Sequence, residues 1–508
     1  MKDQSKNPVT SPHVWTLTTY FAEGFPYTII RIISSVFFRD MKVSLEAIGL
    51  TSLFGLPWVL KFLWGPHVDQ FSTKRRWMLL MQTLLVIMTI TVAFFAPIEN
   101  GVKIVAVILF IGSFIAATHD IAIDGYYMEA LDDKGQAKFV GNRVMGFRIA
   151  MMTGTGVIIT IGAVTNWFIG YLSAGALLLL FLLYHFFFLP VVEKPKRTAL
   201  DMIKAYLRMK TLLFLISAAL VIIFFKWILG MQWTGQLTEA VPFIGKINFS
   251  GWIAIGLLSS LMFLTLLKER IKGLFLKNGE SFYSRAFISF MDRDKMGVFL
   301  VFIVLMRIGE WMLTSMASPF MVDLGLKVHY GWISGGVGLP CTIIGAMIGG
   351  WMISRYTLKK VLLPLLLAQN LTNVFYMFLA IVLNKYIVLN TGADTITPMG
   401  GFNILLVASV CGFDQFASGL GNSVLITIVM RSCLPEFKAA HFAIGSGIWN
   451  ISSVISGVMS GFLAGWLGYW PFFGITFLAS IPGMLMVFFI PFLDEKKGLN
   501  QSGSTPIP

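Results

Sequence analysis

Apolar segments of about 20 residues, the length an α-helix needs to cross a bilayer, alternate with short polar segments along nearly the whole chain. No stretch between them is long enough for a separate soluble domain of ordinary size. The pattern predicts an all-α polytopic membrane protein with fourteen spans. We expect these spans at residues 15–38, 46–67, 78–96, 103–130, 143–164, 168–192, 211–231, 251–267, 297–320, 332–353, 361–383, 400–430, 441–464 and 470–492.

The composition supports a membrane protein and excludes a nucleic-acid-binding one. Of the 508 residues, 56% are hydrophobic and 13% are charged, and the mean hydropathy is +0.78. The net charge of +14 would suit nucleic acid only if a soluble face presented it, whereas these charges lie in short loops. Most Lys and Arg residues fall in loops on one side, which predicts that both termini are cytoplasmic. The predicted outside loops hold only Arg39, Lys42, Lys103, Lys246, Lys327 and Lys385.

An internal repeat indicates two related halves. Asp40 and Asp323 are 283 positions apart, as are Pro57 and Pro340 of two GLP triplets, and each triplet leads into a basic turn. Parallel repeats of six spans are the architecture of the major facilitator superfamily, which is the fold we expect. Residues 1–193 would form one six-helix bundle and 296–508 a second bundle with its tail.

Residues 194–295 are predicted to be an insert between the bundles. It would contribute two extra transmembrane helices and a basic cytoplasmic stretch. Within that stretch, SFYSRAFISF could lie in the membrane interface as an amphipathic helix, or it could belong to a solvated linker.

Acidic residues inside the predicted spans are candidates for proton coupling. In THDIAIDGYY, Asp120 and Asp124 are four positions apart, so a helix places them on one face within reach of each other. Two carboxylates in a site of low dielectric cannot both be charged without cost, which favours binding and release of a proton. The alternative is an ion pair that locks helices together. The other intramembrane acids fall in first and fourth spans of the halves: Glu23, Glu310 and Asp414.

Four cations within spans are candidates for binding an anionic ligand: Lys61, Arg148, Arg31 and Arg307. An arginine at the centre of a span costs at least about 2.5 kcal/mol, so each should face a partner or a wet cavity. Lys61 could instead snorkel to the inner interface. Aromatic residues near these positions could stack on sugar or peptide groups: Tyr20, Tyr27, Tyr126 and Trp311.

The loop GPHVDQFSTKRR between spans 2 and 3 resembles the facilitator loop signature, in which a glycine, an acid and a basic cluster lock one alternating-access state. The matching residues are Gly65, Asp69, Lys74, Arg75 and Arg76. A positively charged inside turn without a gating role would also explain the cations.

No phosphate-binding loop, metal-ligand cluster or nucleophile motif occurs in the sequence. Nothing therefore indicates an enzyme, a metal or a cofactor, and the energy for transport would come from an ion gradient.

KFLWGPHVDQFSTKRRW, HDIAIDGYYMEAL and VMGFRIAMMTGTG together resemble the AmpG-type muropeptide permeases, a facilitator branch that also contains acetyl-coenzyme A transporters. The resemblance implies a monomeric permease of the bacterial inner membrane that imports anhydromuropeptides, which are anionic glycopeptides, together with protons. A carrier of acetyl-coenzyme A or another organic anion is an alternative. A membrane sensor or scaffold that transports nothing is a third.

Overall fold

The computed structural model describes residues 10–61, 64, 65, 68, 72–131, 133–192, 282–293, 295–387, 399–434 and 438–490. These ranges contain helices and connecting turns and no strand. Eleven helices in them are long and apolar enough to cross a membrane. The predicted all-α, multi-pass fold is therefore confirmed.

The first half holds six spans, three of which change helix type along their length. Span 1 consists of α1 (Pro12–Thr28), the π-helix η3 (Ile29–Ile33) and α2 (Ser34–Asp40), and span 2 of α3 (Leu45–Leu50), the 3-10 helix η4 (Thr51–Gly55) and α4 (Leu56–Leu60). The others are α6 (Lys74–Phe95), α7 (Gly101–Ala130), α8 (Asp133–Met152) with η6 (Thr153–Ile158) and α9 (Ile159–Val164), and α10 (Trp167–Phe188).

The second half begins with the short helix α17 (Phe282–Met291), followed by six more spans. These are α18 (Met296–Leu305) with α19 (Ile308–Asp323), η7 (Gly331–Gly338) with α20 (Leu339–Tyr356), α21 (Leu358–Val382), α23 (Gly401–Arg431), α24 (Lys438–Leu467) and α25 (Tyr469–Met486). A 3-10 turn, η8 (Asn384–Tyr386), follows α21.

Twelve of the predicted spans correspond to these helices, although the second, α3–η4–α4, is shorter than expected. The predicted spans 211–231 and 251–267 lie outside the described residues. The count of fourteen, the three domain boundaries and the cytoplasmic termini therefore stay predictions. The SFYSRAFISF stretch is helical as α17, and its Phe290 packs on the His441 ring of α24 rather than lying in solvent.

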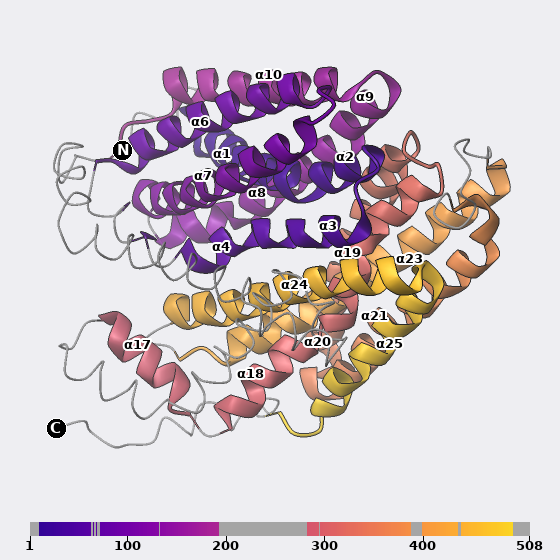
Figure 1. Cartoon of the computed structure of the whole chain (residues 1–508). Coiled ribbons are helices and arrows are strands. Elements are labelled where there is room, and N and C mark those ends of the chain that lie inside the picture. The colour runs from indigo at the N-terminus through magenta and orange to yellow at the C-terminus, as the bar shows by residue number, and fades with distance from the viewer. Residues whose placement is uncertain are drawn as a thin grey trace, which may run out of the picture.

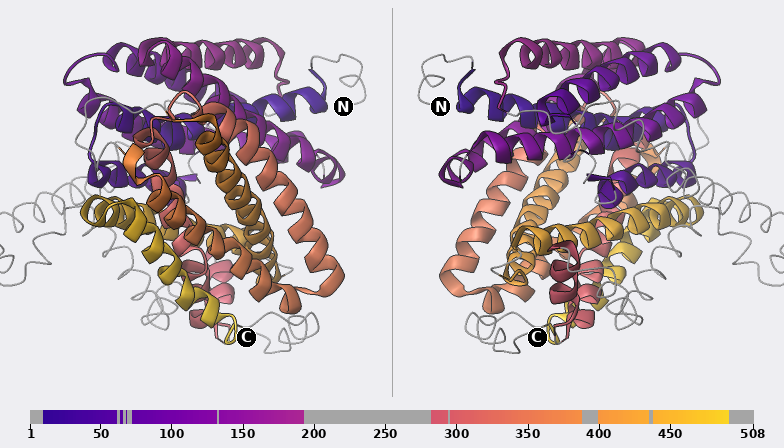
Figure 2. Two further views of the ribbon diagram at one scale, coloured as in Figure 1. Left: turned by 90° about the vertical axis from the view of Figure 1, so that its right-hand side faces the viewer. Right: turned by 90° about the vertical axis from the view of Figure 1, so that its left-hand side faces the viewer.

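The two halves lie side by side, with α1 to α10 on one side and α17 to α25 on the other (Figure 1). The two views of Figure 2 show the same separation. Among the contacts that join them, α24 lies against α3, η4 and α4, η7 lies against η6 and α8, and α19 lies against α2 and α3.

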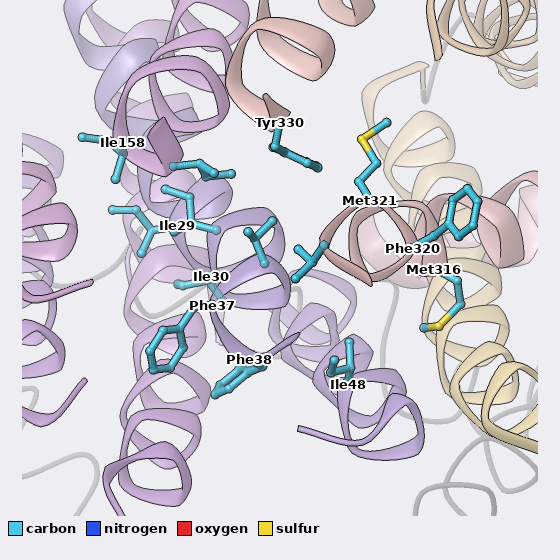
Figure 3. Close-up of a cluster of buried hydrophobic side chains, with 14 of the residues drawn as sticks. Ile29, Ile30, Phe37, Phe38, Ile48, Ile158, Met316, Phe320, Met321 and Tyr330 are labelled. Atoms are coloured by element: carbon cyan, nitrogen blue, oxygen red, sulfur yellow. The ribbon is translucent and has the colours of Figure 1, made fainter. Parts of the chain in front are cut away.

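One hydrophobic cluster extends across both halves near the ends of α2 and α19, the ends predicted to face outside. Ile29, Ile30 and Ile158 of the first half approach Met321 and Tyr330 of the second, and all five are buried (Figure 3). This end of the interface between the halves is packed shut.

Glycines allow the backbones of the two halves to touch at this end. A Cβ built on Gly49 of α3 would lie 2.8 Å from the Cα of Gly461 on α24, and one on Gly335 of η7 would lie 3.0 Å from the Cα of Gly156 on η6. Small residues permit such close helix packing in membranes. Both contacts between the halves therefore depend on positions without a side chain.

We expect Gly461→Ala to destabilise the closed interface by about 1–3 kcal/mol, because overpacking forces backbone shifts. The added Cβ would lie 2.4 Å from the carbonyl oxygen of Leu45, which cannot move aside as a side chain could. Thermal unfolding in detergent measures the effect. Gly447→Ala on the same helix is the matched control, since nothing lies within 4 Å of its Cβ position. Equal unfolding temperatures for both variants would contradict the prediction.

Candidate functional site

Asp120 and Asp124 are on one face of α7, and each has a cation of its own. Asp120 forms an ion pair with Lys61, at the end of α4. Asp124 accepts a hydrogen bond from Tyr20 of α1 at 2.8 Å and pairs with Arg143 of α8 at 2.9 Å. The Arg143 guanidinium also lies 4.6 Å from the centre of the Tyr20 ring. The two carboxylates are thus held by three other spans.

Close packing of α1 on α8 brings Arg143 to this cluster. A Cβ built on Gly146 would lie 2.4 Å from the carbonyl oxygen of Leu17, so only glycine permits the approach. Arg143 is not among the candidate residues derived from the sequence.

Glu23 of α1 is the third carboxylate of the cluster, and no ion pair joins it to a cation within the described ranges. It lies within hydrogen-bonding range of Asp120 and interacts electrostatically with Asp124. Its Oε2 atom is buried without a hydrogen-bond partner. Two carboxyl groups can share a hydrogen bond only if one of them carries a proton.

The charge of this cluster changes with one proton. Three carboxylates, Glu23, Asp120 and Asp124, face two cations, Lys61 and Arg143. The cluster is neutral with one proton bound and carries one negative charge without it. In a membrane interior, where net charge is costly, this arrangement can bind and release a proton.

Arg148 of α8 forms no ion pair with a carboxylate in the described part of the chain. Its guanidinium lies 3.8 Å from the Met151 sulfur, and Tyr27 is among its neighbours. Tyr27 packs edge-on against Trp58 and tilted against Phe147. An intramembrane arginine without a counter-ion is suited to bind an anionic group.

Arg31 is satisfied by the backbone. It donates to the carbonyl oxygens of Ser52 at 2.7 Å and Thr51 at 3.5 Å, both in the 3-10 helix η4. A 3-10 segment leaves α-helical carbonyls without their usual partners, and these must be satisfied within the membrane. Arg31 therefore stabilises the 3-10 segment of span 2 by binding its carbonyl oxygens.

In the second half, Arg307 occupies a break between α18 and α19. It forms a two-pronged ion pair with Glu310 and donates to Asn422 of α23 at 2.5 Å. Glu310 also accepts from Gln369 and Ser418. This pair is neutral and buried.

Asp414 of α23 lies near this pair. It accepts hydrogen bonds from Thr372 at 2.8 Å and Gln415 at 3.4 Å. No ion pair joins it to a cation in the part of the chain that the structure describes.

The aromatic candidates differ in their surroundings. Trp311 lies next to Arg307, whose guanidinium is 5.1 Å from its ring. Tyr126 is fully buried and donates to the carbonyl oxygen of Pro190 at 2.7 Å, as a packing residue would.

The basic residues of the predicted gating loop make contacts within their own half. Lys74 donates to the carbonyl oxygen of Val68, and Arg75 donates to those of Leu189 and Phe186 at the end of α10. Cations are favourable at helix C-termini because the last carbonyl oxygens lack partners within the helix and carry partial negative charge. Arg76 is exposed, Gly65 is helical and lies near Ile121, and Asp69 lies outside the described residues.

Two ion pairs, absent from the candidates derived from the sequence, join the halves where the glycine contacts lie. Arg39 binds both oxygens of Asp323, at 2.5 and 2.6 Å, and Lys327 lies 3.0 Å from Asp40. Each acid therefore pairs with a cation of the other half. We call these four residues the clasp.

The clasp follows the internal repeat. Trp167, the first residue of α10, donates to Asp40 at 2.6 Å, and Tyr469, the first residue of α25, donates to Asp323 at 2.5 Å. Each repeat-related acid is thus held by the last helix of its own half and by a cation of the other half.

The described residues contain no group of three His, Cys, Asp or Glu side chains that could hold a metal ion. The site consists of paired charges and aromatic rings.

Residues 16–268, about half of the chain, match the sequence profile of the Major Facilitator Superfamily. The chain belongs to this superfamily. The Anhydromuropeptide permease of Escherichia coli K12 is 21% identical over 92% of this facilitator and 77% of the permease. The Putative transporter AmpG 4 of Rickettsia conorii is 20% identical over 92% of this chain and 93% of that one.

Solved transporters share the facilitator's fold. A peptide transporter POT crystallised with sulfate has a TM-score of 0.64 and 13% identity, with 94% of each chain covered. A nucleoside transporter NupG has a TM-score of 0.54 at 12% identity, with 94% of this chain and 98% of that one covered. The facilitator is accordingly a multi-pass transporter of a small molecule.

Proposed function

We propose that this facilitator is a proton-coupled symporter that imports anhydromuropeptides across the bacterial inner membrane by alternating access. The observation that carries the proposal is the partly buried cluster of Glu23, Asp120 and Asp124, which faces two cations among the described residues. One proton neutralises it, and the four spans that contribute its residues could then move together. The name of one relative, the Anhydromuropeptide permease, supplies the substrate class.

Alternating access is supported by the arrangement of the halves. The clasp, the glycine contacts and the hydrophobic cluster all close the same end of the interface. If that end faces outside, the structure represents an inward-facing state, and transport requires these contacts to break and re-form. We propose that the protein works as a monomer, with residues 1–193 and 296–508 as its two moving bundles.

Uptake into proteoliposomes tests the proposal. Labelled anhydromuropeptide should accumulate when the outside is more acidic, and acetyl-coenzyme A should not. Accumulation of acetyl-coenzyme A alone would establish the organic-anion carrier instead. Absence of gradient-dependent uptake of either compound would contradict symport and favour a sensor or scaffold.

Arg148 is the residue we assign to the anionic part of the substrate. Arg148→Gln should raise the KM for muropeptide about tenfold, the effect of removing one charge-assisted hydrogen bond, with little change in protein stability.

Arg31→Gln provides the contrast, because Arg31 donates to backbone carbonyls of η4. That variant should lower the unfolding temperature and leave the KM of the remaining folded protein near that of the wild type. An unchanged KM for Arg148→Gln would remove Arg148 from the binding site.

A further inference from the structure

The break in span 7 marks a polar site inside the second half. The α-helix stops at Leu305 and resumes at Ile308, with Arg307 between them at φ −119° and ψ 11°. Broken helices within a membrane occur where the backbone lines a binding site or is buried in protein. The site around the break is therefore a candidate for ligand binding.

Arg307 itself is already neutralised. Its donors reach Glu310, Asn422 and Ser418, and the side chain is 3% exposed. An anion would have to displace the Glu310 carboxylate to bind here. The site therefore suits an uncharged group, unlike the unpaired Arg148.

Two tryptophans stack on the Arg307 guanidinium. Its central carbon lies 5.1 Å from the Trp311 ring centre and 5.7 Å from that of Trp449, and the two rings are 6.5 Å apart with a tilt of 39°. Both indole nitrogens are buried, and neither has a hydrogen-bond acceptor among the residues that the structure describes. A buried donor without an acceptor is energetically unfavourable. A ligand that offers an acceptor would satisfy these two N–H groups.

Trp449 lies on the helix that joins the halves. α24 packs against α3, η4 and α4 of the first half as well as against α19. α19 also contacts α2 and α3, so movement of one half against the other would leave Trp311 and Trp449 together and uncover the helices that carry them.

We infer that Trp311 and Trp449 bind the uncharged N-acetylated sugar rings of the substrate, while Arg148 binds its anionic peptide. This division of roles rests on the proposed function. Sugar rings present C–H faces that stack on indoles, and their hydroxyl and acetamido oxygens accept hydrogen bonds from indole N–H groups. Arg307 acts as a positioning residue that holds both rings.

Binding to the full chain in nanodiscs tests the inference with two probes, N,N′-diacetylchitobiose and the anionic tripeptide alanyl-glutamyl-alanine. Trp311→Phe and Trp449→Phe retain a ring and remove the N–H group. Each should weaken chitobiose binding about tenfold and leave tripeptide affinity within about twofold. Arg148→Gln should have the reverse effect.

Trp332→Phe is the matched control, because Trp332 donates to His329 at 3.0 Å and lies at an exposed position. It should leave both affinities unchanged. Unchanged chitobiose affinity in both tryptophan variants, or equal weakening of both probes, would overturn the inference.

The wild-type protein separates this inference from the proposed function. Chitobiose binding without muropeptide transport would support the sugar site and contradict the proposed function. Failure to bind chitobiose would contradict the sugar site even if muropeptides are transported.

Discussion

Glu23→Gln should abolish gradient-driven accumulation while leaving substrate exchange intact. A pH difference of about one unit supplies about 1.4 kcal/mol per coupled proton, which supports about tenfold accumulation for one proton per substrate. Glutamine resembles the protonated carboxyl group in shape and cannot release a proton. Accumulation should therefore fall to about equal concentrations inside and outside, as measured by labelled-substrate uptake and counterflow in proteoliposomes.

Two comparisons isolate the role of Glu23. Glu129→Gln, at an exposed position near the end of α7, should accumulate substrate like the wild type. Asp120→Asn removes the ion-pair partner of Lys61, whose side chain is 34% exposed, so it should lower stability by about 1 kcal/mol or less and also impair transport. Wild-type accumulation in Glu23→Gln would rule out the carboxylate cluster as the coupling site.

Asp323→Asn should open the end of the interface that the clasp closes. The Arg39 and Asp323 side chains are 10% and 7% exposed, and loss of one partner of a buried pair costs about 3–5 kcal/mol. That is enough to shift a two-state equilibrium by more than about a hundredfold. Spin labels on Lys42→Cys and Val328→Cys, in a background without the three native cysteines, should report a longer distance.

The second ion pair is the internal control for this prediction. Lys327 and Asp40 are 29% and 18% exposed, so Asp40→Asn should shift the distance distribution much less, by about 1 kcal/mol or below. Exchanging the charges, with Arg39→Asp and Asp323→Arg together, should restore closure. A short distance that persists in Asp323→Asn would show that the clasp does not hold this end shut.

Local pattern was enough to predict the helices, because a span must satisfy its own backbone hydrogen bonds and be apolar over a fixed length. It was also enough to place Asp120 and Asp124 on one face of a helix. What the sequence could not provide was their partners. Lys61 belongs to span 2 and Arg143 to span 5. The predicted span 5 began at residue 143, so Arg143 was not recognised as a residue inside the helix, whereas α8 begins at Asp133.

Contacts between the halves were the least predictable feature. Arg39 and Asp323 are 284 positions apart, and only the repeat drew attention to the acids of the clasp. The π-helical segments η6 and η7, which contact each other across the halves, were not predicted from the local pattern either. A count of the charges inside the spans would have helped to find Arg143, since the three acids of the cluster outnumber Lys61 and favour a further cation nearby.

Proton entry during substrate influx tests the central claim most directly. Proteoliposomes loaded with a pH-sensitive dye, at equal pH on both sides, would receive anhydromuropeptide outside. The account predicts that the lumen becomes acidic as substrate enters the wild-type vesicles, and that it stays neutral with Glu23→Gln while substrate still equilibrates. Substrate entry into wild-type vesicles without any acidification would contradict proton coupling.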